Sequence, residues 1–207
     1  MSLTLPARLI LAAVLVPVSL LGIARPTAGE TSAPASLAGQ LLIASPSMDD
    51  PRFQRTVILM VRHNKEGALG IVINRPVGER PLADLLKMIG EKETGAPGQV
   101  RLFAGGPVQL ELGFVVHGAE YRRPETIDVD GRVVMTSSRD ILRDIANGKG
   151  PKQSLIAFGY AGWSPGQLEG ELKRRFWVTA PADPALIFDE DREKVYDSAF
   201  ARRTLDL

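Results

Sequence analysis

Two apolar runs separated by a short turn constrain the fold of this 207-residue chain more than any other feature. The first run, TVILMVRH, covers residues 56–63, and the second, ALGIVINRP, covers residues 68–76. In a strand with one solvent-exposed face, polar and apolar residues alternate. Neither run shows this alternation, so both predict strands buried on both faces. The NKEG segment between them is typical of a turn. The chain is therefore expected to contain a buried hairpin that other elements cover on both faces.

Further strand patterns outnumber the helical ones. Strands are expected within residues 39–48, 100–108, 112–118, 125–137, 153–162 and 176–181. Helical patterns follow at residues 80–91, 138–150, 167–175, 183–188 and 190–203, with Ser138 as the expected cap of the second. Strand and helix do not alternate regularly, which disfavours a doubly wound parallel sheet. The order favours one α+β domain with helices outside a strongly bent sheet.

Composition excludes several classes of function. Removing Arg8 and Arg25 leaves 23 basic residues from Ser36 onward, and removing Glu30 leaves 23 acidic ones. A chain without net charge has no overall field to gather nucleic acid or an anionic membrane, so no nucleic-acid partner is indicated. The absence of cysteine excludes disulfides, thiol nucleophiles and cysteine-bound zinc, and it fits either the cytosol or the periplasm.

The N-terminus has the layout of a secretory signal. Arg8 is its one charged side chain, and residues 9–24 follow without a charge before a segment of small residues. A run of this length is short for a membrane span of about 20 residues. We expect residues 1–38 to form a leader and flexible linker, and residues 39–207 to form the domain. The leader predicts export to the periplasm; an uncleaved inner-membrane anchor and a mis-assigned start codon are the alternatives, and only residues 9–24 could contact a membrane.

Residues 162–166, GWSPG, match the G-x-S-x-G pattern of a serine hydrolase. The oxyanion hole of that site uses the backbone N–H after the serine, and Pro165 has none. Both histidines also precede Ser164, whereas the triad of that fold places histidine after the serine. We therefore expect a helix start, with Ser164 as the N-cap, Pro165 at the first helical position and Gln167 completing a capping box.

The remaining patterns offer no clear catalytic or metal site. His63 and His117 each end an apolar strand, which is typical of a polar strand-end residue; a ligand or general base is the alternative, and the two could converge. No H-x-H or H-E-x-x-H pattern is present, so neither a metal nor a cofactor is expected. The AGGPV segment at residues 104–108 lacks a phosphate-loop pattern and predicts a tight turn or bulge. Trp163 is expected to pack in the core, with an exposed binding anchor as the alternative.

Three long blocks of the sequence are similar to one family. They are GQLLIASPSMDDPRFQRTVILMVRHNKEGALGIVINRP, FAGGPV with GFVVH, and GYAGWSPGQLEGELKRRFWVTAPADPALIFD. These blocks resemble the YqgE/AlgH family (UPF0301, DUF179) from about Gly39 to Phe188. The resemblance implies a single α+β domain whose bifurcated, mostly antiparallel sheet forms a pseudo-barrel with peripheral helices. It also implies a cytoplasmic location, from which the apolar leader departs.

The resemblance supplies no catalytic residues. It marks positions that could line a shared ligand or partner surface, namely His63, Asn64, Asn74, Arg75, Gly105, Gly106, His117, Trp163 and Gln167. We expect a non-enzymatic binding or regulatory protein with an unknown protein or small-molecule partner. One alternative is a hydrolase-type enzyme that uses His63 or His117. Another is a transcriptional regulator, a label that the family carries although no helix-turn-helix pattern is visible here.

Overall fold

The computed structural model describes residues 35–91, 95–188 and 191–204, which belong to one compact unit. The expected leader and most of its linker fall on residues 1–34, outside the described residues. Within the described ranges, none of the helices combines the length and the apolar character that a membrane crossing requires.

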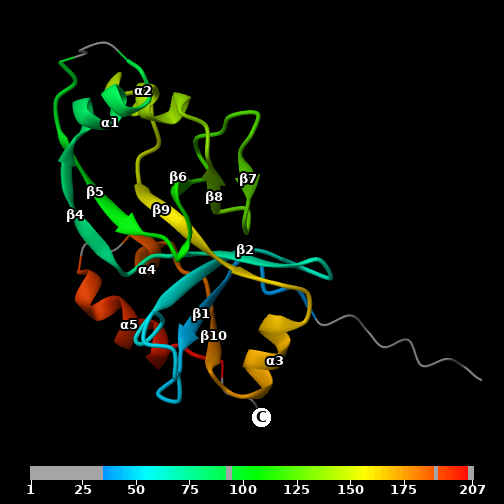
Figure 1. Cartoon of the computed structure of the whole chain (residues 1–207). Helices are drawn as coiled ribbons and strands as arrows, with labels where there is room; N and C mark the ends of the chain where they lie inside the picture. The colour runs from blue at the N-terminus through cyan, green and yellow to red at the C-terminus, as the bar shows by residue number, and fades with distance from the viewer. Residues whose placement is uncertain (1–34, 92–94, 189–190, 205–207) are drawn as a thin grey trace, which may run out of the picture. The chain divides into compact units, whose positions relative to one another are not determined.

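The described part of the chain contains ten strands and five helices (Figure 1). The strands are β1 (Gln40–Ala44), β2 (Val57–Asn64), β3 (Gly67–Val72), β4 (Pro76–Pro81), β5 (Gln99–Ala104), β6 (Val108–Gly118), β7 (Ile127–Asp128), β8 (Val133–Thr136), β9 (Ser154–Trp163) and β10 (Trp177–Pro181). The helices are α1 (Leu82–Met88), α2 (Asp140–Ala146), α3 (Gln167–Lys173), α4 (Pro184–Phe188) and α5 (Arg192–Ala201). The predicted hairpin is confirmed as β2 and β3, which pair antiparallel.

Strand β9 is shared by two halves of the sheet. One half has the order β10-β1-β2-β3-β9, in which β9 pairs with β3 through residues 161–163. At its other end, β9 pairs with β5 on one side and with β6 on the other. The β5–β9 pair is parallel, and the other strand pairs of the described chain are antiparallel. In Figure 1 the yellow β9 runs between the two halves, so the bifurcated α+β sheet is confirmed.

Glycines allow the backbones to cross where the sheet divides. A Cβ atom on Gly105 would lie 2.4 Å from the carbonyl oxygen of Gly159. Gly106 has a φ of +154°, and a Cβ there would lie 2.1 Å from the carbonyl carbon of Tyr160. Backbone atoms cannot move aside as a flexible side chain can, so only glycine fits at these positions. The tight turn expected at AGGPV is this close crossing.

The strands of the first half are buried on both faces, as their apolar runs predict. Alternate residues of β1 and β2 face two separate cores; Leu41 and Leu59 lie in one, and Leu42 and Ile58 in the other. Helices α4 and α5 cover the first core, and α3 covers the second. A third and smaller cluster joins α1 and α2 to β6 and β9. Helix α3 therefore packs over one face of the β2–β3–β9 ladder.

One expected helix start is wrong, and another is confirmed. Helix α3 begins at Gln167, after Gly166 with a φ of +75°, and no side chain caps it. Pro165 and Gly166 form a turn instead, in which the Gln167 N–H donates to the Ser164 carbonyl at 3.0 Å. One of the two hydrogen bonds of the expected capping box is present, because the Ser164 N–H donates to Oε1 of Gln167 at 3.1 Å. Helix α2 begins at Asp140, and Ser138 caps it as expected, because the Asp140 N–H donates to the Ser138 Oγ at 3.4 Å.

Candidate functional site

Three residues on adjacent strands form a row beneath α3. His63 on β2 lies opposite Ala68 on β3, and Ala68 lies opposite Trp163 on β9. Side chains directly opposite each other in a sheet point to the same face, so the row presents His63 and Trp163 to the same helix. Both belong to the surface marked by the family resemblance.

The His63 side chain connects the sheet to α3 and to Leu37 through two hydrogen bonds. The Leu37 backbone N–H donates to its Nδ1 at 3.1 Å, so Nε2 carries the proton and donates to Oε1 of Glu169 at 3.0 Å. The pKa of the Glu169 carboxyl is held below its usual value. The larger cause is a hydrogen bond from the backbone N–H of Glu169 itself, and the hydrogen bond from His63 adds to it. Both ring nitrogens are thus occupied in a buried side chain. Across residues 35–91, 95–188 and 191–204, no group of three His, Asp or Glu side chains is placed to hold a metal ion.

Glu171 on α3 binds two tryptophans and a glutamine. The indole nitrogens of Trp163 and Trp177 donate to its Oε2 at 2.9 and 2.8 Å. Gln167 donates from Nε2 to its Oε1 at 2.9 Å. The indole rings meet edge to face with their centroids 6.1 Å apart, and Phe53 meets Trp177 in the same way at 5.6 Å. Trp163 is only 7% exposed, so its packing role is confirmed and the exposed-anchor alternative is wrong.

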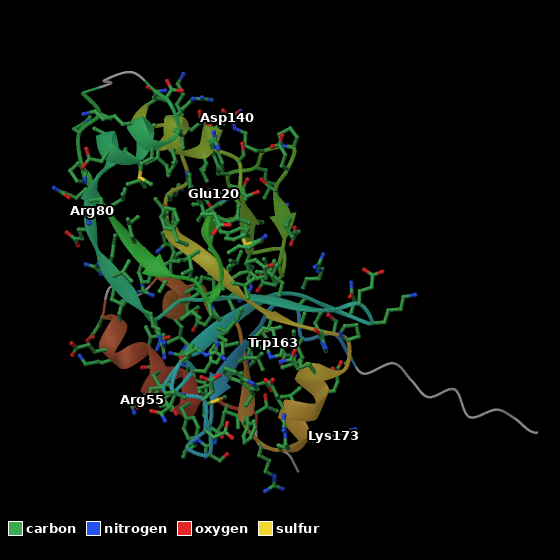
Figure 2. The ribbon with its side chains drawn as sticks, in the orientation of Figure 1. Arg55, Arg80, Glu120, Asp140, Trp163 and Lys173 are labelled. Atoms are coloured by element: carbon green, nitrogen blue, oxygen red, sulfur yellow. The ribbon has the colours of Figure 1, made fainter. Side chains whose placement is uncertain are left out.

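A cleft of about 390 Å³ opens beside these aromatic rings. Figure 2 shows Trp163 at the end of β9, next to α3, which carries Lys173 at its far end. The walls come from the loop after β1, the start of β6, the end of β9, α3 and the start of β10. The lining residues are Met48, Asp49, Asp50, Arg52, Phe53, Pro107, Val108, Gly162, Trp163, Gln167, Glu171, Arg174, Phe176 and Trp177.

Charged side chains surround the opening of this cleft, which we call the α3 cleft. Arg52 and Asp50 form an ion pair at 2.7 Å, and the hydrogen bond from Arg52 holds the pKa of the Asp50 carboxyl below its usual value. The Arg174 guanidinium lies over the Phe176 ring, 4.9 Å from its centroid. Among the described residues, neither Arg174 nor Asp49 has a side-chain hydrogen bond or an ion pair.

Five of the expected surface residues have structural contacts with groups outside α3. Asn64 closes the β2–β3 turn by accepting the Glu66 N–H at 2.9 Å. Asn74 accepts the Val57 N–H and donates to the Arg55 carbonyl, both at 2.9 Å. Arg75 donates to the Gln54 carbonyl at 3.0 Å, and burial lowers the pKa of its guanidinium. Gly105 and Gly106 lie at the strand crossing. The structure therefore gathers His63, Trp163 and Gln167 at α3 and leaves the others elsewhere.

The two histidines do not converge. His117 lies opposite Ser154 at the start of β9, whereas the row with His63 crosses β9 at Trp163. These points are nine residues apart along β9, a path of roughly 30 Å at about 3.3 Å per extended residue. His117 is fully buried, donates from Nδ1 to the Gly118 carbonyl at 3.0 Å and packs against Tyr121. Desolvation lowers the pKa of its imidazole.

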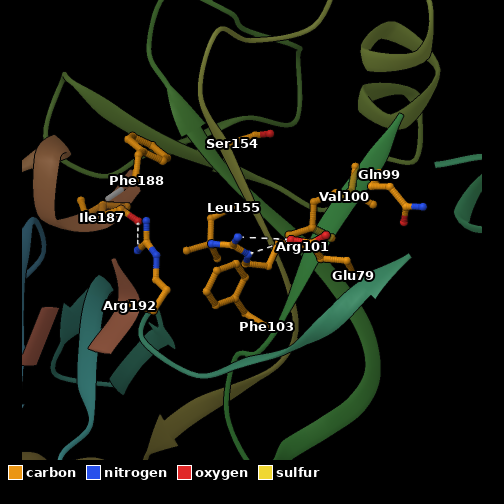
Figure 3. A pocket seen from close by; sticks show the side chains of 11 residues that line it. Glu79, Gln99, Val100, Arg101, Phe103, Ser154, Leu155, Ile187, Phe188 and Arg192 are labelled. Atoms are coloured by element: carbon orange, nitrogen blue, oxygen red, sulfur yellow. Dashed lines mark hydrogen bonds and ion pairs between the residues drawn. The ribbon is translucent and has the colours of Figure 1, made fainter. Parts of the chain in front are cut away.

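Two other hollows contain none of the expected site residues. One, of about 300 Å³, lies between β4, β5 and the last helices (Figure 3). There the buried Arg192 donates to the Ile187 carbonyl at 2.8 Å and lies over Phe103. The other, of about 400 Å³, is a mostly apolar groove between α1, α2 and β6, beside the exposed Met88. The α3 cleft is the hollow that combines expected site residues with aromatic walls.

Comparison with known proteins identifies the family. The sequence profile of the AlgH-like family (DUF179) matches residues 41–207. The chain belongs to the AlgH-like family. A UPF0301 protein of Jannaschia sp. strain CCS1 is 46% identical over 165 residues, which cover 79% of this chain and 86% of that protein. A UPF0301 protein of Rhodospirillum rubrum is 44% identical over 170 residues, covering 82% and 88%.

Solved structures agree with this assignment. The solution structure of the AlgH protein from Pseudomonas aeruginosa superposes with a TM-score of 0.71 at 43% identity, covering 84% of this chain and 92% of that one. The crystal structure of the Corynebacterium diphtheriae protein DIP2367 has a TM-score of 0.64 at 24% identity, covering 81% and 87%, and shows a shared fold.

In this AlgH-like chain, the sequence patterns indicated only Trp163 and Gln167 among the fourteen residues that line the cleft, and did not indicate Asp49, Phe53, Glu171 or Arg174. Three cleft residues share one signal, because Gln167, Glu171 and Arg174 recur at the i, i+4 and i+7 spacing of one helix face. That spacing marks a polar face, but it does not show that the face turns toward two tryptophans from different strands.

Proposed function

We propose that this AlgH-like protein is a non-enzymatic binding or regulatory protein whose ligand occupies the α3 cleft. The bonds of Glu171 to both indoles carry the proposal, because they fix α3 against the ends of β9 and β10. This contact leaves a preformed concave site in which polar groups and the edges of aromatic rings are both exposed, and its volume is within the range of small-molecule sites.

The contacts of the histidines and of Ser164 favour binding over catalysis. A general base must reach the proton that it removes, and the ring nitrogens of His63 bond Leu37 and Glu169 instead. His117 is enclosed at the other end of β9. Ser164 is exposed and precedes Pro165, which has no N–H to donate to an oxyanion.

We also propose that residues 1–38 direct export and that residues 39–207 act as one domain in the periplasm. The motivating feature is the uncharged apolar segment that follows Arg8. Mass spectrometry of the protein from fractionated cells gives the mature N-terminus. Cleavage between residues 24 and 38 in a periplasmic fraction supports export, whereas an intact or later-starting chain in the cytosol contradicts it.

The binding proposal is tested with a defined library of amino acids, nucleotides, sugar phosphates, organic acids and acyl compounds. The chain has two tryptophans, and both contact Glu171, so its tryptophan emission arises at the cleft. A ligand should shift this emission and raise the melting temperature in the unmodified protein and in Lys65→Glu, an exposed charge reversal elsewhere. Arg174→Glu should lose both responses. Responses that survive in Arg174→Glu, or a library without any binder, would contradict the proposal.

A duplex DNA added to the same assay tests the transcriptional-regulator alternative. Binding to phosphates would weaken steeply as salt is raised. We expect no such binding, because the domain carries balanced charge.

A further inference from the structure

We propose that the α3 cleft recognises a small zwitterion, a free α-amino acid whose carboxylate binds Arg174 and whose ammonium group binds Asp49. This inference rests on the proposed function and specifies its ligand class. The proposal follows from the charged side chains that line the cleft, because some of them already have a hydrogen-bonded partner within the described part of the protein and two do not.

Five charged side chains line the cleft, and three of them have internal partners. Arg52 and Asp50 neutralise each other at 2.7 Å. Glu171 accepts three N–H groups, two of them from buried indoles. Among the described residues of the cleft, this leaves one cation, Arg174, and one anion, Asp49, without an oppositely charged partner. A ligand that carries both charges complements this pair without adding net charge to the cleft.

Arg174 is held in a geometry suited to a carboxylate. It follows directly after the last residue of α3, and its guanidinium lies over the Phe176 ring, 4.9 Å from the centroid. Stacking on an aromatic face limits the orientations of the planar fork and leaves its N–H edges free to donate. A guanidinium in this state can donate two parallel hydrogen bonds to one carboxylate.

Asp49 comes from the facing loop, whose backbone is fixed by local bonds. The Met48 N–H donates to the Ser45 carbonyl at 3.0 Å, and the Phe53 N–H donates to the Asp50 carbonyl at 2.9 Å. These bonds form turns on each side of Asp49, so its exposed carboxylate is carried by an ordered segment. An ammonium group is a compact cation with three N–H donors, and a charge-assisted hydrogen bond from it to a carboxylate is stronger than a neutral one.

The cleft also has room for a small side chain beside its aromatic and polar groups. Phe53 and Trp177 contribute aromatic surface, and Gly162 exposes bare backbone in the wall. A volume of about 390 Å³ lies at the small end of ligand sites. Phenylalanine and leucine are therefore the first amino acids to test.

The test is a calorimetric titration of the full chain with L-phenylalanine, L-leucine, N-acetyl-phenylalanine, phenylalanine amide and the tripeptide Gly-Phe-Gly. We expect the free amino acids to bind at least tenfold more tightly than the other three compounds. Arg174→Gln should lose about tenfold in affinity for phenylalanine and nothing for the amide, which has no carboxylate. Asp49→Asn should lose about tenfold for phenylalanine and nothing for the N-acetyl compound. Lys65→Gln serves as the matched control with unchanged affinity.

If the blocked compounds or the tripeptide bound as tightly as free phenylalanine, the proposal of a zwitterionic ligand would be wrong. So would phenylalanine affinity that is unaffected in both variants. If no amino acid binds while another library compound responds through Arg174, the ligand class is wrong and the proposed function stands. If nothing in the library binds, both fail.

Discussion

The indole nitrogens of Trp163 and Trp177 meet at a single oxygen atom, Oε2 of Glu171, at 2.9 and 2.8 Å. The two tryptophans lie on β9 and β10, the outer strands of the order β10-β1-β2-β3-β9. Four strand spacings of about 4.8 Å would hold these strands roughly 19 Å apart in a flat sheet. Their rings are 6.1 Å apart, so the sheet curls, and Glu171 bridges the two ends of the curl.

Replacing Glu171 with glutamine should destabilise the domain by about 1.5–3 kcal/mol, because the charged acceptor of two buried indoles is lost. The one oxygen of the carboxamide can still accept from both indoles, but it carries no charge, and the new NH₂ group would face Nε2 of Gln167, which is also a donor. Urea unfolding followed by tryptophan emission measures the change, with Glu66→Gln, an exposed turn residue, as the control. A stability equal to that of the control would mean that the bridge does not stabilise the curl.

Alanine substitutions at two glycines should have opposite effects. At Gly105, the new Cβ would meet the Gly159 carbonyl oxygen at 2.4 Å, so Gly105→Ala should cost about 3 kcal/mol or more. Gly170 lies in α3 with open space around it, so Gly170→Ala should raise stability by about 0.5–1 kcal/mol. Thermal unfolding of both variants checks the pair. A mild loss at Gly105 would contradict the close crossing at the division of the sheet.

His117 should make the stability fall as the pH drops below about 6.5. Desolvation holds the pKa of the folded imidazole below its usual value of 6.5, with Glu120 opposing and Arg122 adding to the shift. The unfolded chain therefore takes up the proton first, and stability is full above pH 6.5 and falls as the pH drops below it. His117→Asn keeps a donor for the Gly118 carbonyl but cannot titrate.

Urea unfolding at several pH values compares the two proteins. The unmodified protein should lose stability from pH 7 to pH 5, and His117→Asn should lose clearly less. Parallel curves would show that His117 is not the titrating group.

Ser164→Ala should change neither stability nor reactivity. Its hydroxyl makes no hydrogen bond with the described residues, and α3 is capped by the backbone of Gly166 instead. The expected change in unfolding free energy is within about 0.5 kcal/mol. A fluorophosphonate probe should leave Ser164 unlabelled, since Pro165 provides no oxyanion donor. Labelling that disappears in Ser164→Ala would instead support the hydrolase alternative.

The strands could be predicted from the sequence because burial on both faces requires a continuous run of apolar residues, which is a local pattern. The residues of β2 and β3 are apolar in succession, whatever their partners are. The start of α3 was misplaced because Ser164, Pro165 and Gln167 fit a capping box by residue type. The left-handed backbone of Gly166 interrupts that pattern. Glycine can adopt several backbone conformations, and its presence in the sequence does not predict which one it adopts.

The candidate site was only partly predictable, because long-range pairing decides what meets there. Trp163 and Gln167 were expected on a shared surface, and they meet Glu171 at the α3 cleft. His63 and His117 both end apolar runs, yet the row of His63 reaches β9 through β3 at Trp163, whereas His117 on β6 lies opposite Ser154 at the other end of β9. The meeting of Trp163 with Trp177 depends on the curl of five strands, which no local pattern encodes.

The two indole N–H resonances in an ¹⁵N–¹H spectrum of the full chain test the cleft most directly. Each reports one hydrogen bond to Glu171, and the chain has no third tryptophan. Titration with L-phenylalanine should shift both signals together with those of Asp49 and Arg174. Shifts confined to the groove beside Met88, or elsewhere away from α3, with both indole signals unmoved, would contradict the α3 cleft as the binding site.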